Sequence, residues 1–169
     1  FGHIFCAAAG NSGSNGASYP GALGCDNIIC VAATDEGENL AGFSQYHITE
    51  VDLGAPGVDV LSTTPGNNYS YYSGTSMATP HVAGGVAFIF SVLGDASAAE
   101  VKDIIMSTAR PIPALAGRCV TGGVLNVKDA LDATFLGPKI TMVSTVPAEL
   151  DPGVALEVRI QVDPREDEI

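Results

Sequence analysis

Two stretches near the start of the chain are apolar or small at every position and do not alternate with polar residues. They cover residues 4–9 and 28–33. Continuous runs of this kind are typical of parallel strands buried on both faces of a sheet. Shorter strands are expected at residues 51–54 and 58–63, on either side of a turn at Ala55-Pro56-Gly57.

Helical patterns dominate the middle of the chain. An apolar helix is expected at residues 75–93, ending at Gly94, because glycine is favoured just past a helix C-terminus. A capping box at residues 97–100 begins a second helix that runs to about residue 109, and a short helix is expected at 126–131. Strands with interspersed helices predict an α/β domain with a mostly parallel sheet and flanking helices.

The pattern changes near residue 135. Two strand-like runs follow, at residues 140–143 and 156–162, and the second alternates as a half-solvated antiparallel strand does. Two strands do not form a stable domain alone. We therefore interpret residues 1–134 as one domain, and residues 135–169 as a linker and the start of a truncated β-sandwich-like module.

Charge narrows the possible partners. The chain is 46% hydrophobic and has a net charge of −12, yet no Lys or Arg precedes Lys102, whereas nine acidic residues do. Such an acidic segment disfavours nucleic acid and anionic membranes, and favours a cation or a basic substrate. The longest apolar run, residues 82–93, is too short to span a bilayer. Since the sequence begins with Phe1 and not Met, we expect it to be part of a longer protein.

Ser76 is the strongest candidate for chemistry. It lies in the run Gly-Thr-Ser-Met-Ala-Thr-Pro-His-Val-Ala-Gly, residues 74–84, at the beginning of the apolar helix. The unpaired N–H groups of a helix start favour negative charge, which suits a nucleophilic serine and its oxyanion. A serine at such a position without this context is more often an N-cap.

Asn11 is the second candidate. It ends the first buried strand, within Ala-Ala-Ala-Gly-Asn-Ser-Gly at residues 7–13. An asparagine there projects its amide at the carboxyl edge of the sheet, where open α/β folds bind ligands. An isolated asparagine after a strand is otherwise a turn residue.

Residues 74–84 match the serine motif of subtilisin-like serine proteases over its full length, and residues 7–13 resemble the oxyanion segment of that family. The resemblance extends over about residues 3–134 and implies peptide-bond hydrolysis through an acyl-enzyme. It implies that Ser76 is the nucleophile and Asn11 an oxyanion donor, which Thr75 could support. It also implies that the substrate pocket is walled by Ala8, Ala9, Gly10 and Ser18. Weaker similarity occurs at residues 19–21, 43–44, 52–57 and 123–127.

The loops at residues 12–18 and 21–27 depart from the family pattern. The resemblance therefore does not fix the shape of that pocket. The small residues of its wall favour large apolar substrate side chains.

The general base is the missing part. His81 follows Ser76 by five residues on one helix and points elsewhere, while His3 and His47 are more simply surface histidines. The family carries its catalytic Asp and His earlier in the chain than the serine. We therefore expect this chain alone to be inactive. A non-catalytic binding module of the same fold stays an alternative, and an α/β-hydrolase esterase ranks last because no histidine follows residue 121.

Glu50 and Asp52 are one residue apart on an extended stretch, so both carboxylates project to the same side. Together with carbonyls of residues 21–28 they could bind structural calcium, as the matching acids do in some relatives, although two solvated surface acids are commoner. No organic cofactor is expected. Cys25 and Cys119 lie in glycine-containing loops and could pair.

The resemblance finally implies a secreted, monomeric peptidase domain that acts on polypeptides.

Overall fold

The computed structural model describes residues 2–135, 139–142 and 160–163, and the chain divides into two compact units. These units are Phe1–Thr134 and Phe135–Ile169. The division falls where the hydrophobic pattern of the sequence changes.

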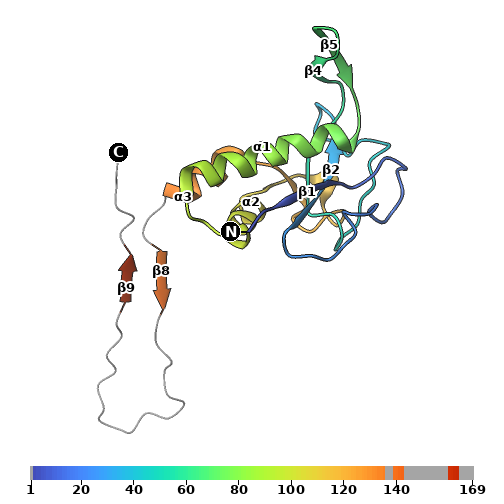
Figure 1. Cartoon of the computed structure of the whole chain (residues 1–169). Helices are drawn as coiled ribbons and strands as arrows, with labels where there is room; N and C mark the ends of the chain where they lie inside the picture. Colours follow the sequence, from blue (N-terminus) through green and yellow to red (C-terminus); the bar gives the residue numbers. More distant parts are fainter. Residues whose placement is uncertain (1, 136–138, 143–159, 164–169) are drawn as a thin grey trace, which may run out of the picture. The chain divides into compact units, whose positions relative to one another are not determined.

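The first unit is built on a five-stranded sheet with the order β1-β2-β3-β7-β6 (Figure 1). Strands β1 (Phe5–Ala8), β2 (Ile28–Thr34), β3 (Leu53–Pro56) and β7 (Gly123–Val124) are parallel. Strand β6 (Arg110–Pro111) pairs antiparallel with β7. The mostly parallel sheet expected from the sequence is confirmed.

Strand β2 shows why its sequence is continuously apolar. All seven of its residues are buried. Ile29 and Val31 belong to the core cluster that includes the helix residues, whereas Cys30 belongs to a second cluster with Leu115. Each face of β2 therefore meets its own core, and the polar residue of the strand, Thr34, lies at its end.

Helix α1 (Thr75–Leu93) packs against β1, β2 and β3 (Figure 1). Its predicted bounds are confirmed, and the N–H of Gly94 bonds to the carbonyl of Phe90 at its end. By length and hydropathy alone, α1 is the one described helix that could cross a membrane. A core helix meets the same test, and α1 covers a sheet.

Two further helices begin at the residues that the sequence indicated. In α2 (Ala98–Ser107), Ser97 and Glu100 form the predicted capping box. In α3 (Val127–Phe135), the side-chain oxygen of Asn126 accepts a hydrogen bond from the N–H of Asp129 at 3.1 Å. A short 3₁₀ helix, η1 (Pro113–Leu115), lies between β6 and β7.

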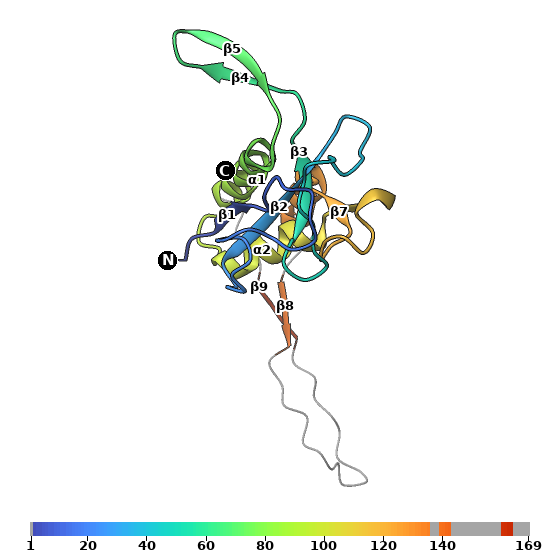
Figure 2. The same cartoon turned by 90° about the vertical axis from the view of Figure 1, so that its right-hand side faces the viewer.

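A long hairpin, β4 (Val60–Thr64) and β5 (Asn68–Tyr72), projects away from the sheet in both views (Figures 1 and 2). The turn predicted at Ala55-Pro56-Gly57 is wrong, because Ala55 and Pro56 belong to β3. Strand β2 pairs with both residues, and Thr34 lies opposite Pro56. A proline is tolerated there because it ends the strand.

The second unit contains β8 (Lys139–Met142) and β9 (Ile160–Asp163), which pair antiparallel. They overlap the two strands predicted at residues 140–143 and 156–162. The rest of the predicted β-sandwich-like module lies outside the described residues.

The cysteine pair considered above is not formed. Cys25 is exposed, Cys119 is buried in the second core cluster, and both are free thiols. Burial raises the pKa of the Cys119 thiol, so it stays protonated.

Candidate active site

Ser76 is exposed in the first turn of α1. The N–H groups of Met77 and Ala78 bond to the carbonyl of Gly74, whereas the Ser76 N–H has no acceptor among the described residues. The first turn of α1 also contains no acidic side chain. Both the free N–H and the positive end of the helix dipole are therefore available to an anion beside Ser76.

Asn11 is held against the beginning of α1 by Thr75. Its side-chain oxygen accepts hydrogen bonds from the Thr75 N–H and from the Thr75 hydroxyl, both at 2.9 Å. The Thr75 hydroxyl oxygen in turn accepts a bond from the Gly10 N–H at 3.2 Å. Because the oxygen end of the carboxamide is bound in this way, its NH₂ end is left free to donate.

The free NH₂ group of Asn11 lies near the Ser76 end of the helix. A Cβ atom built on Gly74 would lie 3.4 Å from this nitrogen and 3.7 Å from the Ser76 backbone nitrogen. The fold thus brings Asn11 and Ser76 together from positions 65 residues apart. Thr75 itself is fully buried, so its hydroxyl positions Asn11 and faces no solvent.

The residues predicted to wall the substrate pocket surround the end of β1. Ala8 and Gly10 are half-buried, Ala9 is fully buried, and Ser18 is exposed. The Ser18 N–H bonds to the carbonyl of Ala9 at 2.7 Å. The loop after Asn11 therefore folds back against this strand end.

Gln45 fixes that loop, and the sequence did not single it out. Its side-chain oxygen accepts a bond from the Ser18 hydroxyl at 3.0 Å, and its NH₂ group donates to the Gly16 carbonyl at 2.6 Å. A Cβ at Gly10, whose φ is +113°, would lie 1.9 Å from the same Gln45 oxygen. The only signal was its place after Phe43-Ser44, a stretch of moderate family resemblance.

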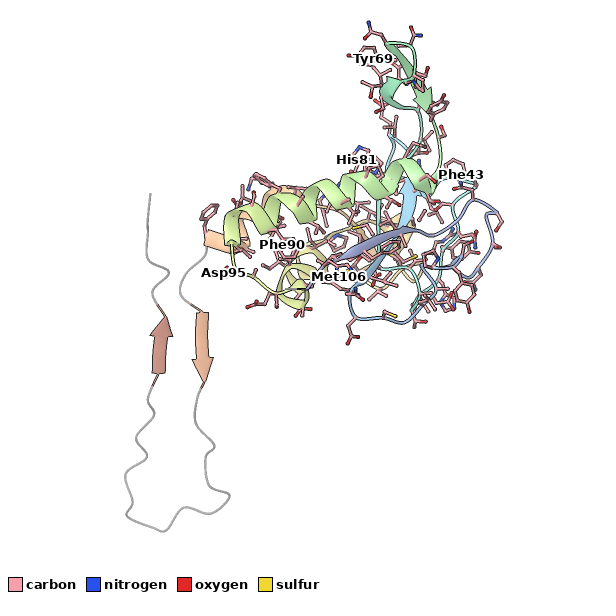
Figure 3. The ribbon with its side chains drawn as sticks, in the orientation of Figure 1. Phe43, Tyr69, His81, Phe90, Asp95 and Met106 are labelled. Carbon is pink, nitrogen blue, oxygen red and sulfur yellow. The ribbon has the colours of Figure 1, made fainter. Side chains whose placement is uncertain are left out.

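No described histidine is hydrogen-bonded to Ser76. His81 lies on the outer side of α1, with its ring exposed and its Nδ1 2.9 Å from the carbonyl oxygen of Met77 (Figure 3). His47 contacts Thr49, and His3 is exposed before β1. The structure therefore brings Ser76 and the Asn11 side chain together, and none of the three histidines is hydrogen-bonded to Ser76.

An apolar groove of about 860 Å³ runs between α1 and β1, and Ser76 lines it. Strand β1 is at the edge of the sheet, and Phe5 is 48% exposed. Cys6 also lines the groove, but burial raises the pKa of its thiol to about 11. Cys6 therefore stays protonated at neutral pH and is no competing nucleophile.

Glu50 and Asp52 each accept a hydrogen bond from a backbone N–H group, and Glu50 Oε1 also lies 3.9 Å from His47 Nδ1. Asp52 Oδ2 accepts a bond from the Cys30 N–H at 2.6 Å, and Glu50 Oε2 accepts one from the Ala17 N–H at 2.8 Å. The described residues contain no group of three or more His, Cys, Asp or Glu that could hold a metal ion. Two carboxylates alone supply too few of the about six to eight oxygen ligands that calcium takes, and calcium at these residues stays a prediction.

The chain that carries this site is similar to known proteins. Residues 2–137 match the model of the subtilase family, and the matched region contains both Asn11 and Ser76. Subtilisin DY from Bacillus licheniformis is 46% identical over 112 residues, which is 64% of this chain and 40% of that protein. Thermophilic serine proteinase from Bacillus sp. (strain AK1) is 46% identical over 66% of this chain and 26% of its own length. The chain thus spans less than half the length of these relatives.

Solved structures show the same likeness. The prenylagaramide maturation protease PagA superposes with a TM-score of 0.68 at 29% identity, over 76% of this chain and 50% of that one. A protease from Pseudoalteromonas arctica gives 0.65 at 33% identity, over 75% and 41%.

Proposed function

The chain belongs to the subtilase family of serine peptidases, and from this premise we propose that it supplies the nucleophile and the oxyanion donors of a serine endopeptidase. The observation that carries the proposal is the clamp of Thr75 on the Asn11 side-chain oxygen. This clamp directs the Asn11 NH₂ group toward the start of α1, where the Ser76 N–H is also free.

In this reaction the Ser76 hydroxyl oxygen attacks the carbonyl carbon of a peptide bond, while a base removes its proton. The carbonyl oxygen becomes an oxyanion and accepts hydrogen bonds from the Ser76 N–H and the Asn11 NH₂ group. The C–N bond then breaks, the amine leaves with the proton from the base, and an acyl-enzyme forms. Water hydrolyses the ester by the same steps and restores Ser76.

The base and the acid that orients it come from polypeptide outside this sequence. Support comes from the three histidines, none of which contacts Ser76 among the described residues. The groove between α1 and the edge strand β1 is the surface on which such a segment would dock beside Ser76. The chain alone is accordingly inactive.

The substrate is a polypeptide, and the domain acts as a monomer without an organic cofactor. Small residues at Ala8 and Gly10 leave room for a large apolar side chain before the cleaved bond. An extracellular location agrees with the subtilisins that the chain resembles. The division of the chain into two compact units after Thr134 supports a domain boundary between this part and a β-rich module.

A second candidate is a non-catalytic binding module of the same fold, which the lack of a placed base favours. Labelling with a fluorophosphonate probe separates the two. In the protein that includes the segment carrying His and Asp, we expect the probe to label wild type but not Ser76→Ala. The control Ser91→Ala changes another exposed serine of α1 and should label normally. If wild type in that setting stays unlabelled, the binding module is the better account.

A further inference from the structure

Lys102, on α2, places a positive charge beside the first part of the chain. Its ammonium donates a hydrogen bond to the carbonyl of Ile28, the first residue of β2, at 2.6 Å. No Lys or Arg precedes Lys102 in the sequence, whereas nine acidic residues do. The first cation along the chain is therefore folded back onto the acidic segment.

Lys102 lines a cavity of about 230 Å³ together with Glu50, Asp52 and the loop at residues 21–26. As described above, backbone N–H groups occupy one oxygen of each carboxylate. The second oxygen of Glu50, Oε1, lies 3.9 Å from His47 Nδ1, and the second oxygen of Asp52 has no hydrogen bond among the described residues. The cavity is thus negatively charged on one wall and carries the Lys102 ammonium on another.

Asp52 lies in the same cavity as the Lys102 ammonium. Asp52 is half-buried, and burial raises the pKa of its carboxyl. The Cys30 N–H and the positive charge of Lys102 act in the opposite direction. Burying part of a carboxylate costs free energy unless it is hydrogen-bonded or paired, and the Cys30 N–H at 2.6 Å and the Lys102 ammonium in the same cavity are its partners here.

We propose that the Lys102 ammonium is the resident cation of this cavity, in the place for which the sequence predicts calcium. Two carbonyls of the lining loop already accept hydrogen bonds, since Leu23 accepts from the Cys25 N–H and Cys25 accepts from the Ile28 N–H. The Ile28 carbonyl accepts from Lys102 itself. Calcium entering here would lie beside a like charge and would compete with the Lys102 ammonium for the Ile28 carbonyl.

One consequence is that the cation of this cavity is covalently part of the chain. It joins α2 to β2 and cannot be removed by a chelator. This inference concerns the stability of the fold and is independent of any reaction at Ser76, so either can fail without the other.

Thermal unfolding of the full chain tests the proposal. With calcium chloride or with EGTA, the Tm of wild type should agree within about 1 °C, because no site is filled. Lys102→Met keeps the apolar stem but removes the charge, and it should lower the Tm by about 5 °C, since Asp52 and the Ile28 carbonyl lose a partner. Lys102→Arg, which retains a positive charge, should lose less.

Lys128→Met is the matched control, because the Lys128 ammonium pairs with Asp132 at 2.5 Å on an exposed surface. It should change the Tm by less than about 2 °C. The proposal is overturned if Lys102→Met unfolds at the wild-type temperature. It is also overturned if calorimetric titration of wild type with calcium chloride shows binding that Asp52→Asn abolishes, a measurement that needs no lysine variant to fold.

Discussion

Replacing Thr75 by valine tests whether the beginning of α1 positions Asn11. Thr75 is fully buried, and valine keeps its branched shape while removing the hydroxyl. Two hydrogen bonds disappear: the one to the Asn11 side-chain oxygen at 2.9 Å and the one from the Gly10 N–H at 3.2 Å. Asn11 keeps its second bond, from the Thr75 N–H.

The expected loss of unfolding free energy follows from the hydrogen-bond donor that Thr75→Val leaves unpaired. The Gly10 N–H loses its acceptor in a partly buried place, and leaving such a donor unsatisfied costs about 1–3 kcal/mol of unfolding free energy. Thr79→Val is the matched control on the same helix. The Thr79 hydroxyl only bonds to the carbonyl of Thr75 one turn earlier, so its loss should cost less than about 0.5 kcal/mol.

Urea unfolding of wild type, Thr75→Val and Thr79→Val measures these differences. In the complete enzyme, Thr75→Val should also slow labelling of Ser76, and Thr75→Ser should restore it. The upper limit is the loss of about 10²–10³-fold that removal of an oxyanion asparagine causes in a subtilisin, a value taken over from that relative. Equal stability of the two valine variants, together with unchanged labelling, would refute the positioning role of Thr75.

Two further predictions concern residues outside the motifs. Gln45→Leu removes the hydrogen bonds to Ser18 and Gly16 and should lower the free energy of unfolding by about 1–3 kcal/mol. Amide hydrogen exchange in the loop that carries Ser18 and Gly16 should become faster, and unchanged exchange would contradict the role of Gln45. The hydrogen bond and charge of Arg110 lower the pKa of Glu38. The contribution of this pair to folding stability is therefore present at neutral pH and is lost as the pH falls. Wild type should therefore be more stable than Glu38→Gln at pH 7, and the difference in Tm should shrink progressively as the pH falls below the ordinary glutamate pKa of about 4.3.

Much of the fold could be predicted, because a strand buried on both faces is recognisable in the sequence as a continuous apolar run. Residues 28–33 of β2 are continuously apolar and buried on both faces, whereas β1 is equally apolar although it is an edge strand with Phe5 exposed. The capping box of α2 is a local signal. Strands β6 and β7 are two residues long, so they have no period to detect. The turn at residues 55–57 was wrong because a proline within a short apolar run indicates a turn, whereas pairing with β2 made Pro56 the last residue of β3.

Only some residues of the candidate site could be predicted from the sequence. Ser76 and Asn11 lie within long motifs, so their proximity could be expected. Gln45 lies in a loop, and its bonds to Ser18 and Gly16 span 27 and 29 residues. Lys102 acts over a still longer separation, 74 residues from Ile28. Contacts of this kind depend on how the loops fold together, which neither periodicity nor a motif reports.

The position of these groups separates two parts of the proposed chemistry. The oxyanion donors come from the end of β1 and the start of α1, which pack directly on each other, so this part is assembled within one unit. A base must instead lie within hydrogen-bond reach of the Ser76 hydroxyl. The exposed ring of His81 is turned back to the Met77 carbonyl, and moving it to Ser76 would require α1 to unwind. The apolar groove beside Ser76 offers a route that leaves the helix intact. Docking of a further segment there, and not rearrangement of this unit, is therefore the step on which activity should depend.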